Sequence, residues 1–135
     1  MPSRPIPSAV REFLVAPNLA TVATLGADGA PQATVVWFLL EGDRILINTK
    51  AGRVKALNLD RDPRVALTVF DCGAPDRSVQ LRGLVDERRV GAAADEDIHR
   101  LSRRYVGSDF ERSEERISYL IAITSWFQWG MAEVE

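Results

Sequence analysis

Cysteine and histidine are almost absent from this chain. Its 135 residues contain one cysteine, Cys72, and one histidine, His99. A single cysteine excludes an internal disulfide, and so few soft ligands cannot supply the paired cysteines and histidines of a structural zinc site. We therefore expect no metal centre. Because free thiols suit a reducing compartment, we also expect a cytoplasmic location.

Long apolar runs and a basic surplus are missing too. No hydrophobic stretch approaches the ~20 residues that cross a bilayer, and the N-terminal segment MPSRPIPSAV lacks the apolar core of a secretory signal. The formal net charge is -2, from 17 basic and 19 acidic residues, so the basic field that binds nucleic acid is lacking. We expect neither a membrane nor a nucleic acid as partner. Hydrophobic residues make up 46% of the chain, which is enough to form the core of one domain, residues 1–135.

Recognisable catalytic motifs are also absent. The sequence has no HExxH pair, no Walker phosphate loop and no GxGxxG turn. His99 stands among arginines in a helical pattern, which is typical of a solvent-facing or capping histidine. Cys72 stands in a loop of glycine and proline with no histidine nearby in sequence. The acidic residues are spaced as helix caps and solvated faces. We predict no catalytic residue, so in an enzyme a bound cofactor would supply the reactive group.

Short β-strand patterns dominate what is present. Three prolines in residues 1–7 predict an extended arm, and Pro17 ends a short amphipathic helix that includes Val10 and Leu14. Asp28-Gly29 is a hairpin signal between two strands. The predicted strands are 20–25, 32–40, 44–49, 65–70, 78–86, 117–124 and 126–134, with a loop at 71–77, and the longer predicted helices are 54–59 and 92–105.

The order of these elements predicts a mostly β fold with minor α content. The strands follow one another through hairpin connections without regular strand–helix alternation, which disfavours a doubly wound sheet. An antiparallel barrel of about six or seven strands with a few flanking helices is the natural closure, because a barrel leaves no exposed edge. The 32–40 stretch, QATVVWFLL, is apolar on both faces. It predicts a strand covered by the core on one side and by a partner or ligand on the other.

The segment 45–64, ILINTKAGRVKALNLDRDPR, is the most informative part of the chain. A strand pattern is followed by a glycine and a short helical pattern, so Lys50, Arg53 and Lys55 gather at the beginning of a helix. The helix macrodipole is already positive at this end, and cations there cost stability unless an anion lies among them. Free N–H groups, hydroxyls and cations together form a phosphate site. The alternative is a solvated basic helix start.

Two further groups of side chains leave alternatives open. Trp37 fits core packing, and the aromatic run WFQW at 126–129 fits either the core or a dimer interface. Gln80 and Arg82 share one face of a strand, where they either meet solvent or line a groove for an anionic ligand.

An ordered set of motifs resembles a known family. The motifs are LATVATL (19–25), DGAPQ (28–32), VVWF (35–38), INT (47–49), GRVKA (52–56), NL (58–59), RDPRVAL (61–67), RG (82–83) and RRY (103–105). In this order they resemble the pyridoxamine 5′-phosphate oxidase-like superfamily of split β-barrel flavin and deazaflavin oxidoreductases. The likeness is strongest to the actinobacterial branch that uses the deazaflavin coenzyme F420. The specificity lies in the ordered set rather than in any single motif.

The resemblance implies a fold, an assembly and a site. The fold is an FMN-binding-protein-like split β-barrel, and the assembly is a homodimer with cofactor sites at the subunit interface. The positions that match the family's phosphate contacts are Arg53 and Lys55, with Asn48, Thr49, Lys50 and Gly52 in the same segment. The positions that match its ring contacts are Val35, Val36 and Trp37, with Gln32 and Ala33 near the ring's edge and Arg82 on a neighbouring strand.

The resemblance also implies a reaction. Hydride passes from reduced F420 to an unsaturated or electron-poor small-molecule substrate, which needs no strong acid or base from the protein. FMN is the alternative cofactor, since it also offers a tricyclic ring and a phosphate. A non-catalytic protein that stores or carries the cofactor is the third interpretation. The polyglutamate tail of F420 would need further cations, for which Arg61, Arg64 and Arg77 are candidates. The C-terminal arginine-and-histidine segment of true pyridoxamine phosphate oxidases is not found, which disfavours vitamin B6 oxidation.

Overall fold

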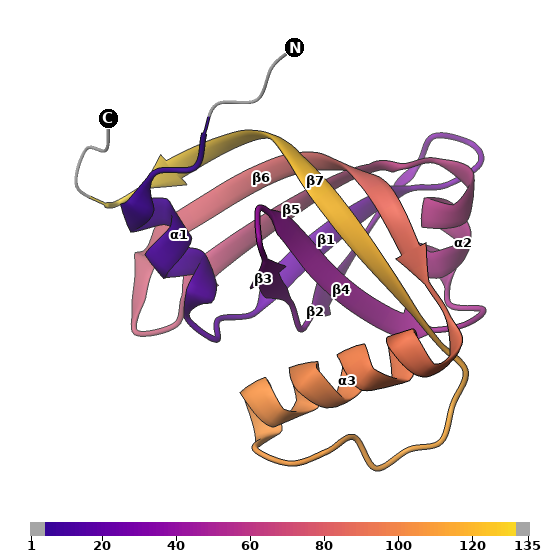
Figure 1. Ribbon diagram of the computed structural model, residues 1–135. Coiled ribbons are helices and arrows are strands. Elements are labelled where there is room, and N and C mark those ends of the chain that lie inside the picture. The colour runs from indigo at the N-terminus through magenta and orange to yellow at the C-terminus, as the bar shows by residue number, and fades with distance from the viewer. Residues whose placement is uncertain (1–4, 132–135) are drawn as a thin grey trace.

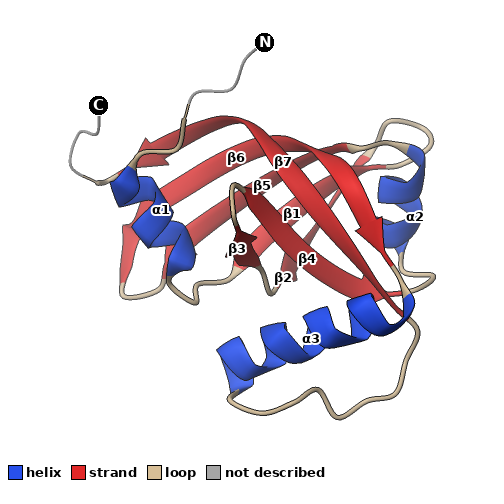
Figure 2. Ribbon diagram, viewed as in Figure 1, coloured by secondary structure: helices blue, strands red, loops and turns tan. Residues whose placement is uncertain are grey.

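The structure, a computed structural model, describes residues 5–131 and consists of one curved sheet with helices around it (Figures 1 and 2). The strands are β1 (Ala20–Leu25), β2 (Pro31–Val36), β3 (Leu39–Glu41), β4 (Arg44–Lys50), β5 (Arg64–Asp71), β6 (Ala74–Arg89) and β7 (Arg116–Trp129). The helices of this part of the chain are α1 (Ser8–Val15), α2 (Val54–Arg61) and α3 (Gly91–Val106). None of these helices is both long and apolar enough to cross a membrane.

The strand order explains how the barrel closes. The seven strands pair in the order β2-β1-β5-β6-β7-β4-β3, so the two edge strands, β2 and β3, are neighbours in sequence. Only Trp37 and Phe38 separate them. The sheet must therefore curl until its two edges approach each other. The predicted mostly β, antiparallel split barrel is confirmed, with seven strands.

Gln80 and Arg82 share one face of β6, as predicted, and the opposite face of this strand belongs to the core. Val79 and Leu81 are buried, whereas Gln80 and Arg82 on the same strand are exposed. The buried face of β6 packs with that of β7, which includes the ring of Tyr119, and with aliphatic side chains of the other strands in one hydrophobic cluster.

Helices α1 and α2 lie at opposite ends of the barrel (Figure 1). The first buries Val10, Phe13 and Leu14, and the second buries Ala56 and Leu59, in the same core cluster as the strands. The buried Val10 and Leu14 of α1 are positions that the helical spacing in the sequence predicts.

Helix α3 lies outside the barrel beside β4 and β7 (Figure 1). Its last turn carries Arg103 and Arg104, which suits the negative end of the macrodipole. It ends at Gly107, whose left-handed backbone (φ 87°) allows its N–H to bond the carbonyls of Ser102 and Arg103. Gly107 thus closes the helix, one residue after its last helical residue, Val106.

The prediction of one strand at 32–40 is wrong. The stretch divides into β2 and β3, which lie on opposite edges of the sheet. At the division Phe38 is fully buried, while Trp37 turns away and stacks on Tyr105 of α3, with 5.5 Å between ring centroids. The apolar pattern on both faces therefore marks a junction at which successive side chains enter different environments. The outward-facing Val35 of β2 is 63% exposed in this single chain.

The prediction of separate strands at 117–124 and 126–134 is also wrong. Residues 116–129 form the continuous strand β7, and residues 132–134 lie outside the described part. Arg82 pairs with Ser125 while Gly83 pairs with Ile123, which leaves Thr124 as the extra residue of a β-bulge. The bulge shifts the alternation of inward-facing and outward-facing residues by one position. In the sequence, this break in the pattern looks the same as the end of a strand.

Two smaller differences concern loops. The predicted loop at 71–77 is shorter, because Asp71 already pairs with Ala74 across a turn at Cys72 and Gly73. Of the predicted arm 1–7, residues 1–4 lie outside the described part, and residues 5–7 precede α1 without regular structure.

Candidate functional site

A cleft of about 380 Å³ opens where several parts of the chain meet. The junction of β2 and β3, the end of β4, the start of α2, helix α3 and the segment 110–116 all contribute to its lining. The turn between β4 and α2 brings the predicted cation cluster to this place.

Three cations surround the start of α2. Lys50 ends β4, Arg53 precedes α2 and Lys55 lies in its first turn, and all three line the cleft. Arg53 occupies the N-cap position without a side-chain capping hydrogen bond. The first N–H groups of any helix lack an intrahelical carbonyl, so this end keeps its capacity to bind an anion. The buried Thr49 adds a hydroxyl to the same wall.

Two further arginines, Arg112 and Arg116, line the same cleft. Arg116 donates from Nε to Oδ1 of Asn48 at 2.9 Å and from Nη1 to Glu114 at 2.9 Å. Both guanidinium groups lie over the ring of Phe110, with 5.3 Å from Arg112 and 4.9 Å from Arg116 to the ring centroid. The loop after α3 and the first residue of β7 thus add positive charge to the cleft that contains the start of α2.

The cations of the cleft repel one another. Burial lowers the pKa of Lys55 below its ordinary 10.5, and the nearby charges of Arg53 and Arg116 lower it further. Burial likewise lowers the pKa of Arg116, with smaller contributions from Arg112 and Arg53, against the opposing effect of Glu114. A negative ligand among these groups would relieve both effects.

The β2–β3 junction provides an aromatic and aliphatic wall. Trp37 lies nearly parallel to Tyr105, with an interplanar angle of 7°. The hydroxyl of Tyr105 accepts the N–H of Phe38 at 3.3 Å and donates to the carbonyl of Asn18. This pair of bonds holds the junction, and with it the Trp37 ring, against α3. Val35 extends the apolar wall into the cleft.

The structure brings together eight of the predicted site residues, namely Val35, Val36, Trp37, Asn48, Thr49, Lys50, Arg53 and Lys55. Four others do not line the cleft of the single chain. Gln32 and Ala33 lie farther along β2, and Gly52 occupies the β4–α2 turn with a positive φ of 87°. Arg82 lines a second hollow on the outer face of the sheet.

Sequence reasoning missed almost half of the cleft lining. The missed residues are Leu19, Ile98, Leu101, Phe110, Arg112, Glu114 and Arg116. Most belong to α3 and the following loop, which are distant from α2 in sequence. The one available signal was a phenylalanine followed by arginines in a stretch without strand or helix periodicity.

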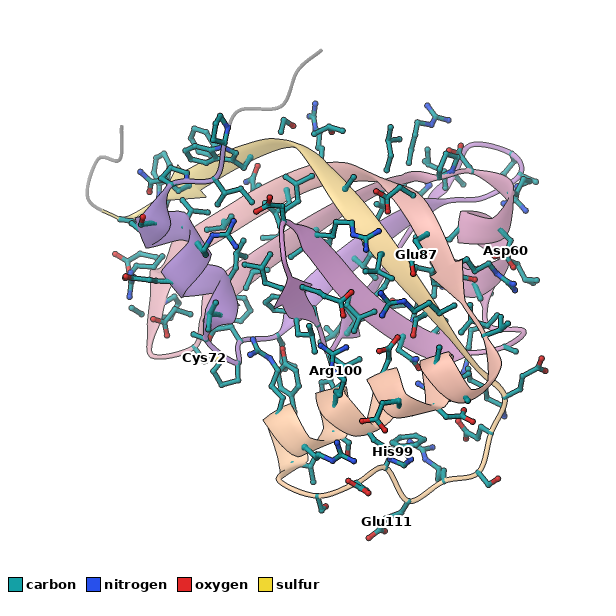
Figure 3. All side chains as sticks on the ribbon, in the orientation of Figure 1. Asp60, Cys72, Glu87, His99, Arg100 and Glu111 are labelled. Carbon is teal, nitrogen blue, oxygen red and sulfur yellow. The ribbon has the colours of Figure 1, made fainter. Side chains whose placement is uncertain are left out.

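His99 and Cys72 take no direct part in this cleft. His99 is half-buried on the side of α3 that faces the following loop, and its Nδ1 accepts the N–H of Phe110 at 3.1 Å (Figure 3). It lines a smaller neighbouring hollow. Cys72 is exposed in the β5–β6 turn. Within residues 5–131, no group of three or more His, Cys, Asp and Glu side chains is placed to hold a metal ion.

The prediction that the acidic residues form caps and solvated faces is wrong for Asp97. Its side chain is only 4% exposed and forms ion pairs with Arg89 at 3.3 Å and Arg100 at 3.1 Å. The same two arginines pair with Glu41 of β3 at 2.8 and 2.9 Å. Figure 3 shows Arg100 extending from α3 toward the strands. Asp97 lies beside Ile98 on the buried face of the helix, and its ion pair with Arg89 of β6 ties α3 to the barrel.

Comparison with known proteins places most of the chain in one family of sequences. The model of the pyridoxamine 5′-phosphate oxidase family matches residues 6–130. A curated pyridoxine/pyridoxamine 5′-phosphate oxidase of Kineococcus radiotolerans is 40% identical over 79 residues, which are 58% of this chain and 35% of that protein. The chain therefore corresponds to only part of the length of this curated relative.

Two solved structures are similar over nearly the whole chain. An F420 reductase superposes with a TM-score of 0.82 at 27% identity, over 90% of this chain and 98% of its own. A conserved hypothetical protein of Mycobacterium tuberculosis superposes with a TM-score of 0.71 at 25% identity, over 100% of this chain and 96% of its own. The barrel and its helices thus recur in both.

Proposed function

This chain belongs to the pyridoxamine 5′-phosphate oxidase family, and on that premise we propose that it is an oxidoreductase with a phosphate-bearing tricyclic cofactor in the cleft at the start of α2. F420 is the favoured cofactor, and the reaction is hydride transfer from its reduced form to a small electron-poor organic molecule. The observation that carries the proposal is the cation cluster of Lys50, Arg53 and Lys55 facing an aromatic wall across one cleft.

The phosphate assignment rests on charge. The positive end of the α2 dipole and the cations around it both attract an anion to the same place. Each charge-assisted hydrogen bond to a phosphate contributes about 1.5–3 kcal/mol. The lowered pKa of Lys55 adds to the case, because the free cluster is repulsive and an anion would stabilise its charged form.

The ring assignment rests on shape and polarity. Val35, Val36 and Trp37 offer a continuous apolar surface, and the stack on Tyr105 fixes the Trp37 ring in place. The bound cofactor supplies the hydride and the electrons. The chain then has to bind the phosphate, orient the ring and exclude water. None of the described residues that line the cleft is a histidine or cysteine, in keeping with this division of labour.

The structural likeness to an F420 reductase supports F420 as the cofactor. FMN is the second candidate, because the chain matches the pyridoxamine 5′-phosphate oxidase family and FMN, like F420, carries a phosphate and a tricyclic ring. The arginines expected to hold the acidic tail of F420, Arg61, Arg64 and Arg77, do not line the cleft. Arg112 lines the cleft and is exposed, so we assign the acidic tail of F420 to Arg112 instead. A carrier of the cofactor without turnover is the third candidate.

A second copy of the chain is proposed to complete the site. The outer face of the sheet carries small residues in register, because Ala33 pairs with Ala23, Ala23 with Ala66, and Ala66 with Arg82. This small-residue face includes a hollow of about 390 Å³ lined by Leu84. A twofold dimer through this face would bring Ala33 and Arg82, which lie outside the cleft of one chain, to the subunit interface.

The first test is a titration of the purified protein with F420 and, separately, with FMN, followed by fluorescence. Tighter binding of F420 supports the reductase, whereas tighter binding of FMN moves the protein to the alternative. Binding of neither contradicts the proposed function. Turnover of reduced F420 with a panel of quinones and nitroaromatic compounds separates an enzyme from a carrier.

The phosphate site is tested by the double variant Arg53→Ala/Lys55→Ala. We expect cofactor binding to weaken by more than about tenfold, since two charge-assisted contacts are lost, while the melting temperature changes little. The matched control is Arg11→Ala/Arg103→Ala, which removes two cations that pair with Asp43, Glu96 and Asp109 outside the cleft. Normal binding by the first double variant would show that the phosphate site is assigned to the wrong place.

A further inference from the structure

We infer that Arg116 is a further anion-binding residue of the cleft, and that the buried carboxylate of Asp97 positions it through Ser118 and Asn48. The inference rests on the proposed function, because it adds a fourth contact to the phosphate cluster at the start of α2. It also assigns Asn48 a different role from that predicted, as a residue that orients Arg116 and does not itself contact the ligand.

A chain of hydrogen bonds fixes the orientation of the Asn48 amide. The hydroxyl of Ser118 donates to Oδ2 of Asp97 at 2.8 Å, so its oxygen is left to accept Nδ2 of Asn48 at 2.9 Å. The same Nδ2 also donates to the carbonyl of Ala94 at 3.0 Å. Both N–H groups of the amide are therefore used on the buried side. Oδ1 of Asn48 is consequently directed toward Arg116.

This orientation fixes the guanidinium of Arg116. Oδ1 of Asn48 accepts Nε at 2.9 Å, and Glu114 accepts Nη1 at 2.9 Å. Neither contact uses Nη2. Because a guanidinium is planar, fixing Nε and Nη1 also fixes the direction of Nη2. The side chain is 11% exposed and lines the cleft, so it offers an anion a donor that is already oriented.

The charge balance of the cleft favours a negative ligand. Its lining contains one acidic residue, Glu114, against the basic residues Lys50, Arg53, Lys55, Arg112 and Arg116. In a half-enclosed space such an excess favours a ligand with more than one negative charge. An isolated Arg116–Glu114 ion pair would leave most of this positive charge without compensation.

The network could instead serve only to attach α3 to the barrel, and two of its parts separate the two roles. The ion pair of Asp97 with Arg89 of β6 and the pair of Arg100 with Glu41 of β3 attach α3 to the barrel, and neither involves Asn48. The variant Ser118→Ala removes the connection from Asp97 to Asn48 and leaves those ion pairs in place. A role in attachment alone therefore predicts no effect on ligand binding that depends on Arg116.

Calorimetric titration with inorganic pyrophosphate tests the inference on the intact protein. We expect Arg116→Gln to weaken binding about tenfold or more, while Arg103→Gln, outside the cleft, leaves it unchanged. Ser118→Ala should weaken binding about threefold in the wild-type background and have no further effect in Arg116→Gln, because its action passes through Arg116. Glu114→Gln should strengthen binding, since it removes the one acid of the lining.

Each outcome decides a separate point. If Arg53→Gln weakens pyrophosphate binding and Arg116→Gln does not, the inference is wrong and the proposed phosphate site stands. If the wild-type protein does not bind pyrophosphate at millimolar concentration, both the inference about Arg116 and the proposed phosphate site are wrong. An equal effect of Ser118→Ala in both backgrounds means that Asp97 has a structural role only.

A second variant covers the case in which Ser118→Ala does not fold. Arg116→Lys keeps the charge but loses the planar donor that Asn48 orients. We expect an affinity well below that of the wild type. Wild-type affinity in Arg116→Lys would contradict the positioning role.

Discussion

Lys55 illustrates how one side chain can oppose folding and favour a ligand. Its pKa lies below the ordinary 10.5 because burial and two neighbouring arginines disfavour the ammonium form. The unfolded chain therefore binds the proton more strongly than the free folded protein. In the free protein the protonated side chain lowers the free energy of unfolding, and this cost disappears as the pH rises between the folded and unfolded pKa values. An anion in the cleft reverses the sign, because it stabilises the ammonium form.

This sign leads to a prediction about proton uptake. Binding of pyrophosphate at mildly alkaline pH, below 10.5, should draw protons onto the protein, and the affinity should fall as the pH rises through the lowered pKa of Lys55. Calorimetry in two buffers with different heats of ionisation measures the uptake directly. The variant Lys55→Gln should take up fewer protons than the wild type, and the difference separates Lys55 from the titration of pyrophosphate itself. Equal proton changes in the wild type and in Lys55→Gln would contradict the prediction.

The position of Gly83 shows why the barrel needs its bulge and its glycine at the same place. The pairing of β6 with β7 shifts between Arg82 and Gly83. A Cβ added to Gly83 would lie 2.4 Å from the carbonyl oxygen of Ala122 and 2.6 Å from Cγ2 of Ile121. The two longest strands can therefore approach each other at this point only if no side chain is present.

The substitution Gly83→Ala should lower the free energy of unfolding by about 1–3 kcal/mol, because backbone atoms of β7 must move. The matched control is Gly73→Ala in the β5–β6 turn, where the nearest atom to an added Cβ, Oδ1 of Asp71, is 3.4 Å away. That change should stay within ~0.5 kcal/mol. Urea unfolding followed by tryptophan fluorescence compares the two. Equal stabilities would mean that the strands can relax around a methyl group.

The outer face of the barrel raises the question of assembly. The small-residue face has a hollow beside Leu84, which is 43% exposed, and Phe127 and Trp129 of β7 are also exposed. Their pairing partners on β6 are Gln80 and Ser78, so both aromatic residues border this face. Exposed apolar surface of this kind is typical of an interface. We therefore expect a twofold homodimer through this face.

The variant Leu84→Glu should shift the protein from dimer to monomer, because it places a charge in the proposed interface. The control Val106→Glu changes an apolar residue that is 62% exposed at the end of α3, and it should leave the dimer intact. Light scattering over a range of concentrations gives the mass of each. A wild-type protein that is monomeric at every concentration would exclude both the dimer and a site shared between subunits.

The sequence by itself determined the elements whose causes are local. The bounds of β1, the Asp28-Gly29 hairpin, the end of α3 at Gly107 and the cation cluster before α2 all follow from residues within a few positions of one another. Residue propensity, hydrophobic alternation and the helix dipole act over that distance, so the sequence alone is enough to predict these elements.

Only the tertiary structure decided which distant residues meet. It placed β2 and β3 on opposite edges of the sheet, brought Arg116 beside Lys55, and paired the buried Asp97 of α3 with Arg89 of β6. None of these contacts leaves a period in the sequence, because each is set by how the whole sheet curls and where α3 then packs. The cationic part of the cleft near α2 could therefore be predicted, whereas the part contributed by α3 and the segment 110–116 could not.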